Sequence, residues 1–334
     1  MFLTTAAALT ATALTLSACE TGPASPPVEQ AVGLPLDAPR VSVESTGEGE
    51  KKVLSFADIG AEQNLTFTTR SDFSQTIPDK PTAATKAKDY ATDNLAKDNG
   101  GDEVTLPLEG KVEEATQDVE GQAPATRNAF FTVRNPETTG DNNEAMPSAD
   151  GFQVGWRGLD NGQMNSIRLA APTEARDTAR AEVEQALMKL PALPVVFPDE
   201  AVGKGASWSV DSRVTGDSTM LQTTTYTIKK MEGSVVELDV DIAQRPALGA
   251  LSLEGRTDDP ELAKQNLEVL DSASATTGSI TVDTTKPLPT GGFVDVATAV
   301  VYGTKDSATN KSKENTDGGS NKVVQNFRST INFG

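Results

Sequence analysis

The chain has 334 residues, with 48 acidic and 29 basic side chains, a formal net charge of −19 and no histidine. This negative charge disfavours nucleic acids and anionic lipid headgroups as partners, because both carry charge of the same sign. The absence of histidine removes the commonest general base and the commonest metal ligand from any candidate site. Hydrophobic residues make up 37% of the chain, which is enough for the core of one large domain or two smaller ones.

Residues 1–18 form an uncharged stretch that is rich in alanine, threonine and leucine and that ends directly before Cys19. An apolar N-terminal stretch with small residues at its end is typical of a cleaved secretory signal peptide, although a basic residue usually stands at its start and is missing here. The run Leu16-Ser17-Ala18-Cys19 resembles the lipobox of bacterial lipoproteins, in which the cysteine thiol takes a diacylglycerol. We therefore expect a signal peptide at 1–18 and lipidation of Cys19, with palmitate-type chains that anchor the protein on the extracytoplasmic face of the cell membrane.

The composition changes directly after Cys19. Five prolines and few large apolar residues follow, up to residue 40, and such a composition is typical of a flexible, partly extended linker. The sequence therefore predicts that residues 19–40 are a lipidated N-terminus and a tether. Residues 41–334 then form a β-rich extracytoplasmic body, either as one unit or as two halves at 41–172 and 191–334.

Alternation of apolar and polar residues is the main pattern of this body. Residues 64–69 and 235–242 show it most clearly, and the pattern recurs in about twelve segments. The pair Asn161-Gly162 lies between two such runs, and this pair is the strongest short signal for a β-hairpin with a type I′ turn. The body is therefore predicted to form antiparallel strands.

One helix is predicted between the two strand-rich parts. Residues 173–190 carry small and apolar side chains at helical spacing on one side and charged side chains on the other, which is the pattern of a helix that packs on a sheet. Thr173 is the expected N-cap and Pro191 the expected stop. The predicted fold class is α+β, with a large curved antiparallel β-sheet, or two adjoining sheets, and one main covering helix at about 173–190.

Two runs of residues carry a resemblance to a known family. In residues 195–210, a turn with a proline leads through Gly203 and Gly205 into a strand that contains Trp208, and the second run is residues 277–292. Both are similar to stretches of a family of uncharacterised actinobacterial cell-envelope lipoproteins, which is defined only as a domain of unknown function. The resemblance implies a cell-envelope lipoprotein without a known activity, and it supplies no functional residues. From the residues themselves we expect a tight turn at the glycines and a buried Trp208.

Two functions of different classes fit these observations. The first is a structural or interaction module of the cell envelope, which presents acidic loops to wall polymers or proteins. The alternative is a carrier or binding protein for a lipid or other apolar ligand, held in a cleft between sheet and helix. One expectation is that Phe and Leu side chains from the sheet fill the space under the helix, because protein interiors usually are filled. If a cleft is present instead, it is expected near Val183 and Leu187, because alanines at the start of the helix allow a close approach to the sheet and larger side chains near its end do not. Its candidate ligand-binding residues are Phe67, Phe130, Phe131, Val183 and Leu187.

No enzymatic activity is expected. The chain has no histidine and no Gly-x-Ser-x-Gly motif, and its one cysteine is assigned to lipid. Acidic residues are so abundant that a carboxylate row such as Glu237, Asp239 and Asp241 is more simply interpreted as the solvated face of a strand, and we expect neither a metal nor a cofactor. The expected partners are the membrane, through the lipid anchor on Cys19, and an apolar ligand or an envelope protein, but no nucleic acid.

Overall fold

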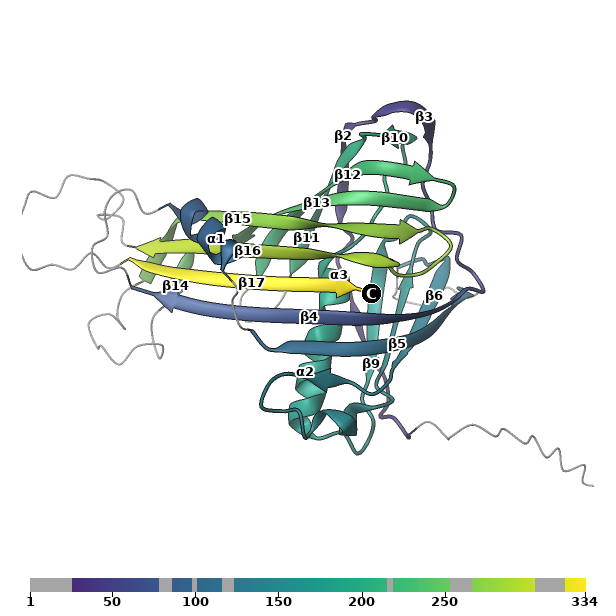
Figure 1. Ribbon diagram of the computed structural model, residues 1–334, viewed down its shortest axis with the longest axis horizontal. Helices are drawn as coiled ribbons and strands as arrows, with labels where there is room; N and C mark the ends of the chain where they lie inside the picture. The colour runs from purple at the N-terminus through teal and green to yellow at the C-terminus, as the bar shows by residue number, and fades with distance from the viewer. Residues whose placement is uncertain are drawn as a thin grey trace, which may run out of the picture.

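The computed structural model describes residues 26–77, 86–97, 101–115, 123–214, 219–252, 266–303 and 322–334. The predicted signal peptide and the predicted lipidation site Cys19 lie outside these ranges. Within them, the main element is one antiparallel sheet of 15 strands, and a separate two-stranded sheet joins β3 and β10 (Figure 1). The strands are β1 (Val32–Pro35), β2 (Arg40–Ser45), β3 (Glu48–Lys52), β4 (Glu62–Thr76), β5 (Glu103–Glu114), β6 (Arg127–Val133), β7 (Glu137–Thr138), β8 (Gln153–Gly158), β9 (Met164–Ala170), β10 (Val202–Lys204), β11 (Ser207–Val214), β12 (Met220–Glu232), β13 (Val235–Pro246), β14 (Ala250–Ser252), β15 (Asn266–Asp283), β16 (Gly291–Gly303) and β17 (Val323–Phe333). The helices are α1 (Ala87–Ala96), the 3₁₀ turn η1 (Met146–Ala149), α2 (Asp177–Leu187) and α3 (Lys189–Ala192).

The strand order of the main sheet is β1-β9-β8-β6-β5-β4-β17-β16-β15-β13-β12-β11-β2, with β14 added beside β15 and β7 beside β5. Most strands from the first half of the chain thus lie together at one end, and β11 to β17 lie together at the other, where β2 joins them as the neighbour of β11. The two groups join where residues 67–76 of β4 pair with residues 324–333 of β17. One hydrophobic core runs across this junction. The α+β class with a large antiparallel sheet is confirmed, and the two halves considered from the sequence are two parts of one sheet with one core.

The sheet is curved, and α2 and α3 lie on the inner side of the curve (Figure 1). In β13, Val236, Leu238 and Val240 point inward and are buried, whereas Glu237 and Asp239 point outward. Successive side chains of a strand point to opposite faces, so the alternation seen in the sequence selects the face that curves around the helices.

The covering helix is shorter at its start than the sequence predicts. Helix α2 begins at Asp177 with Arg176 as its N-cap, and Thr173 does not cap it. The backbone N–H of Thr173 donates instead to the carbonyl of Pro27, because this part of the chain pairs with the N-terminal segment. Pro191 does not end the helical region either, since it lies within the short helix α3.

After α3, residues 193–198 form an extended segment that is buried throughout its length. A buried extended segment needs partners for its backbone polar groups, and two strands of the sheet supply them. Trp208 Nε1 donates to the carbonyl of Val196 at 2.8 Å, and the Tyr226 hydroxyl donates to the carbonyl of Pro194 at 2.9 Å. Burial raises the pKa of Tyr226 far above its ordinary value, so its hydroxyl stays protonated and available as a donor. Trp208 is fully buried, as the sequence predicts.

The hairpin predicted around Asn161-Gly162 is present, as β8 and β9 pair in antiparallel fashion. Its turn is not of type I′, because Gly162 has a φ of +97° but Asn161 is outside the left-handed region. The buried segment explains the difference: Phe197 N donates to the carbonyl of Asn161 at 2.8 Å. A Cβ on Gly162 would lie 2.1 Å from the carbonyl oxygen of Val195, so the glycine is also required by this close approach.

The tether predicted for residues 19–40 is too long. From Pro26 onward the chain lies on the body: β1 pairs with β9, Val28 forms a β-bridge with Pro172, and Glu29 forms an ion pair with Arg180 at 2.8 Å. The physical reason is that β9 would otherwise present a row of unpaired N–H and C=O groups at the edge of the sheet, and β1 covers that edge.

Helix α1 covers the outer face of β15, β16 and β17, opposite α2 and α3 (Figure 1). Its residues Ala87 and Ala91 are fully buried against the sheet. Arg328 of β17 donates to the carbonyl of Asn94 in the last turn of α1 at 3.0 Å and forms an ion pair with Asp295 at 2.8 Å. A cation at the C-terminal end of a helix is favourable because it opposes the helix dipole.

We predict that Trp208→Ala lowers the free energy of unfolding by about 3–5 kcal/mol, because it removes a fully buried indole ring. Trp208→Phe keeps most of the ring volume and loses only the hydrogen bond to Val196, so it should cost about 1–2 kcal/mol. Urea unfolding followed by circular dichroism measures both values. An unchanged midpoint for Trp208→Ala would contradict the central role of this residue in the core.

Candidate functional site

The structure does not place the sequence-predicted ligand residues in a cleft. Phe67, Val183 and Leu187 are fully buried, Phe131 is 2% exposed, and all four belong to the main core. Phe130 points to the opposite face of β6 and is 42% exposed. The prediction of a cleft beneath Val183 and Leu187 is therefore wrong.

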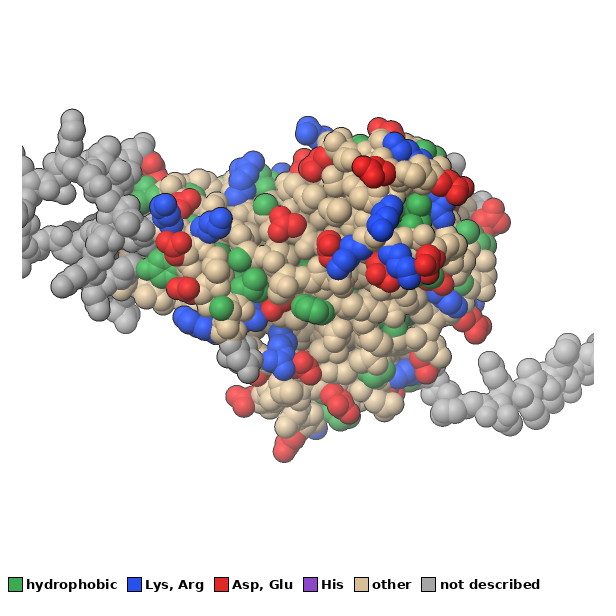
Figure 2. Space-filling model, turned by 45° about the horizontal axis from the view of Figure 1, so that its top comes forward, with side chains coloured by type: hydrophobic (Ala, Val, Ile, Leu, Met, Phe, Trp, Pro, Cys, Tyr) green, Lys and Arg blue, Asp and Glu red, His purple; other side chains and the backbone are tan. Residues whose placement is uncertain are grey.

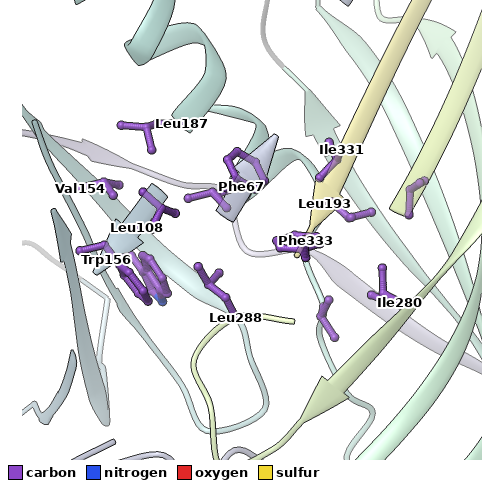
Figure 3. Close-up of a cluster of buried hydrophobic side chains, with 14 of the residues drawn as sticks. Phe67, Leu108, Val154, Trp156, Leu187, Leu193, Ile280, Leu288, Ile331 and Phe333 are labelled. Carbon is purple, nitrogen blue, oxygen red and sulfur yellow. The ribbon is translucent and has the colours of Figure 1, made fainter. Parts of the chain in front are cut away.

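Large side chains from the sheet fill the space below the larger residues of α2. Phe67 of β4 lies 5.4 Å from Phe333 of β17, measured between ring centroids, and Phe131 stacks on Trp156 at 5.5 Å. Figure 3 shows Leu187 directed from the helix toward this cluster. Protein interiors are close-packed, and here aromatic rings from the sheet fill the space below the larger residues of the helix.

An open cleft begins at the junction of α2 and α3. Its volume is about 500 Å³, which lies within the usual range of about 300–1,000 Å³ for small-molecule sites. The helices form one wall, and the inner faces of β4, β11, β12, β13, β16 and β17 form the other. The lining residues are Ser71, Asp72, Phe73, Gln185, Met188, Lys189, Ala192, Leu193, Val214, Met220, Gln222, Ile242, Gln244, Val294, Val296, Phe327, Arg328, Ser329 and Ile331.

The sheet side of the cleft is mostly apolar. Phe73 and Phe327 form an aromatic pair with ring centroids 5.1 Å apart, and Phe73 is 53% exposed although it lies on the inner face. Leu193 and Ile331 line the cleft and also belong to the buried cluster drawn in Figure 3. The cleft thus offers apolar surface to whatever occupies it, beside a core that is already filled.

A row of hydrogen-bonded polar side chains crosses the inner face along the cleft. Gln222 donates to the carbonyl of Ala192 at 2.7 Å, Gln244 donates to Gln222 at 2.8 Å, and Thr298 donates to Gln244 at 2.8 Å. The hydroxyl of Ser274 lies 2.8 Å from that of Thr298. This row links the end of α3 to strands β12, β13, β15 and β16, so the helical wall is fixed to the sheet wall.

Two further hollows adjoin the cleft. The smaller, of about 180 Å³, shares Met188, Ala192 and Val214 with it. The larger, of about 540 Å³, shares Gln222 and Gln244 with it. The row of glutamines therefore separates the cleft from the larger hollow.

The larger hollow lies where β13 and β15 move apart. These strands pair only between Val235–Asp239 and Ser279–Asp283. Beyond this stretch, hydroxyl side chains replace the backbone ladder: Thr276 Oγ1 accepts from the Ile242 N–H at 3.1 Å and donates to the Ile242 carbonyl at 3.0 Å. The sheet is therefore held together at this point by side chains.

Lys189 is the cation that the helical wall contributes to the cleft. Its side chain is half-buried, and Nζ donates to Ser329 Oγ of β17 at 2.7 Å. Among the described residues, no carboxylate forms an ion pair with it. Burial lowers the pKa of Lys189 to about 8, because removal of water disfavours the charged amine.

A second buried cation, Arg127, is part of the core and has a partner. Its guanidinium lies 2.6 Å from the carboxylate of Asp58, and the two side chains are 3% and 1% exposed. It also lies over the ring of Phe56, 4.4 Å from the centroid. The space beside this pair measures only about 30 Å³, which is the volume of roughly one water molecule. The pair is therefore a structural feature and no candidate ligand site.

Metal binding has no support within the part of the chain that the structure describes, where no group of three acidic, histidine or cysteine side chains could hold an ion. The carboxylate row of β13 lies on the outer face, and Asp239 forms an ion pair with Lys229 at 3.0 Å. Figure 2 shows acidic and basic side chains interspersed over one face of the molecule.

No protein-family model matches the chain, and no curated protein matches its sequence. No helix among the described residues is long and apolar enough to cross a membrane. The functional argument therefore depends on the geometry of the cleft and on the N-terminal sequence features.

One signal in the sequence points to the observed cleft. Lys189 is the only charged residue between Ala186 and Pro198, and long charged side chains are rarely buried without a reason. The other lining residues come from eight elements that are far apart in the sequence, and no local pattern brings them together.

The free energy of unfolding is predicted to rise with pH between about 8 and 10.5 through Lys189. In this window the unfolded chain holds a proton on Lys189 that the folded chain has released, because the pKa is 10.5 when unfolded and about 8 when folded. Urea unfolding of wild type and Lys189→Met across this pH range isolates the contribution, since the variant leaves Asp72 and Arg328 of the cleft in place. Identical pH dependence in both proteins would show that the amine is well solvated.

Proposed function

We propose that the chain is a lipid-anchored extracytoplasmic protein that binds an apolar ligand in the cleft between the inner face of the sheet and the α2–α3 junction. The observation that supports this proposal most directly is the cleft of about 500 Å³ with its apolar sheet wall. Transfer of apolar surface out of water is the main source of affinity for such a ligand, at about 25 cal/mol per Å².

Two further features favour a binding role. Phe73 keeps half of its ring exposed inside a concave surface, where a bound apolar group would cover it. The hydrogen bond from Gln222 to Ala192 joins the two walls, and the hydrogen bond from Gln244 orients the Gln222 side chain. A cleft that exists before the ligand arrives loses less conformational entropy on binding.

The location is proposed from the sequence alone. The run before Cys19 and the resemblance to envelope lipoproteins both favour a protein held by lipid on the extracytoplasmic face of the cell membrane. The proposal includes no catalytic step, cofactor or metal, and it assigns a carrier or receptor role to the folded body.

A structural or interaction module of the envelope is the second candidate. It is favoured by the net charge of −19 and by the edge strand β1, on which Val32 and Leu34 are 59% and 41% exposed. Exposed apolar side chains on a sheet edge are a common place for another protein to pair. This candidate does not use the cleft, so experiments on the cleft distinguish the two.

We predict that Ser71→Trp weakens the binding of a neutral apolar probe by roughly tenfold or more, which corresponds to about 1.4 kcal/mol. Ser71 is exposed on the inner face of β4 and lines the cleft, so an indole ring there occupies ligand space without disturbing the core. The measurement is a fluorescence titration of N-phenyl-1-naphthylamine into the full chain in a Cys19→Ala background, which avoids detergent.

Ser74→Trp is the matched control. Ser74 is also exposed and lies on the same strand, but it points to the outer face, so this variant should bind the probe like wild type. If the wild type does not bind the probe, or if Ser71→Trp and Ser74→Trp bind it equally well, the binding proposal fails and the interaction module becomes the leading candidate.

Cys19→Ala is predicted to release the protein from the membrane fraction or to leave its N-terminal segment uncleaved, because the acyl chains have no thiol to attach to. Fractionation of cells that express each form, with mass spectrometry of the N-terminal peptide, measures both effects. A wild-type protein that is wholly soluble and carries a free thiol at Cys19 would contradict the lipoprotein assignment.

A further inference from the structure

The amine of Lys189 is placed at a point where the helix wall and the sheet wall of the cleft meet through polar atoms. It begins α3 and reaches across to β17, where its Nζ donates to Ser329 Oγ at 2.7 Å. Ser329 pairs directly with Ser71 in the register of β17 and β4, so both hydroxyls are on the inner face with Cβ atoms about 5 Å apart. An ammonium group and two hydroxyl groups thus lie together in the cleft.

Among the side chains that the structure describes, no carboxylate forms an ion pair with the amine of Lys189. Among the described residues, the hydrogen bond to Ser329 is the only polar interaction of the Lys189 side chain. Two other charged residues, Arg328 and Asp72, line the cleft, and Arg328 is held by Asp295 at 2.8 Å on the outer face. A charge that is moved out of water without a partner costs free energy, and an anion beside Lys189 would offset that cost.

We propose that the ligand of the cleft is amphipathic, with an anionic carboxylate or phosphate group at Lys189, Ser329 and Ser71 and an apolar chain along the sheet wall. This inference depends on the proposed function and specifies the chemical class of its ligand. The apolar chain lies against Leu193, Ile331 and the aromatic pair of Phe73 and Phe327, which border the hydroxyl groups on β4 and β17.

The ionisation of Lys189 is consistent with this role. Its pKa of about 8 leaves the amine mostly protonated at neutral pH, and burial is the cause of the shift. An anion in contact with the amine favours the charged form. The net charge of −19 opposes an anion only weakly at this distance, because exposed charges beyond about 8 Å are screened at physiological ionic strength.

The test compares three ligands of the same length in the full chain, again in the Cys19→Ala background. These are cis-parinaric acid, which is a fluorescent fatty acid, its neutral methyl ester, and the corresponding amine. We expect wild type to bind the acid roughly tenfold or more tightly than the ester, because only the acid can form a charge-assisted hydrogen bond with Lys189, and to bind the amine most weakly.

Lys189→Met keeps an unbranched side chain and removes the charge, so it should bind acid and ester with equal affinity. Lys189→Arg restores the cation and should restore the preference for the acid. Lys204→Met, at an exposed lysine of β10, is the matched control and should behave like wild type. Circular dichroism of each variant confirms that it is folded before the titration.

The outcomes separate this inference from the proposed function. If acid and ester bind equally well and Lys189→Met changes neither, the cleft binds apolar ligands but the anionic site is wrong. If none of the three ligands binds, the proposed function itself is wrong. Displacement of the probe by millimolar inorganic phosphate alone would identify a site for a free anion and would also overturn the amphipathic ligand.

Discussion

Three side chains on the inner face hold the backbone of residues 192–196 inside the curve of the sheet, and the position of the cleft depends on them. Gln222, Tyr226 and Trp208 each donate one hydrogen bond to a carbonyl of this segment. A buried carbonyl without a donor costs about 1–3 kcal/mol. The segment is therefore most stable in the position where these three donors reach its carbonyl groups. Because α2 and α3 lead directly into that segment, the same bonds place the helical wall opposite β4 and β17.

Sequence reasoning succeeded where structure depends on near neighbours. The alternation in residues 235–242 became β13, and the Asn161-Gly162 pair marked a real hairpin. The predictions from the sequence were wrong where the structure depends on contacts between residues that are far apart in the chain. Whether space remained below Val183 and Leu187 depended on Phe67 and Phe333, which are neighbours only because β4 pairs with β17. The type of the hairpin turn, the length of the tether and the start of α2 were likewise decided by contacts from other parts of the chain.

Arg127 and Lys189 are two cations with different surroundings. Arg127 has a carboxylate at 2.6 Å and is closed off from solvent, and such a pair fixes the packing of the core around it. Lys189 has a hydroxyl group as its only polar contact within the described residues and borders a cleft of about 500 Å³. Buried charges in proteins are usually paired with an opposite charge, because an unpaired buried charge lowers the stability of the fold. Lys189 therefore differs from Arg127 in that its amine, which has no ion-pair partner among the described residues, borders an open space.

The position of β17 in the sheet limits the order in which the strands can pair during folding. It follows every other described strand in the sequence, yet it lies between β4 and β16 in the sheet. Gln75 and Gln325, which share a hydrogen bond across this junction, are 250 residues apart. During synthesis β4 therefore has only β5 as a neighbour until nearly all described residues have been made, and contacts of such long range form slowly. In a chain of this design the pairing that joins the two groups of strands forms only after β17 has been made.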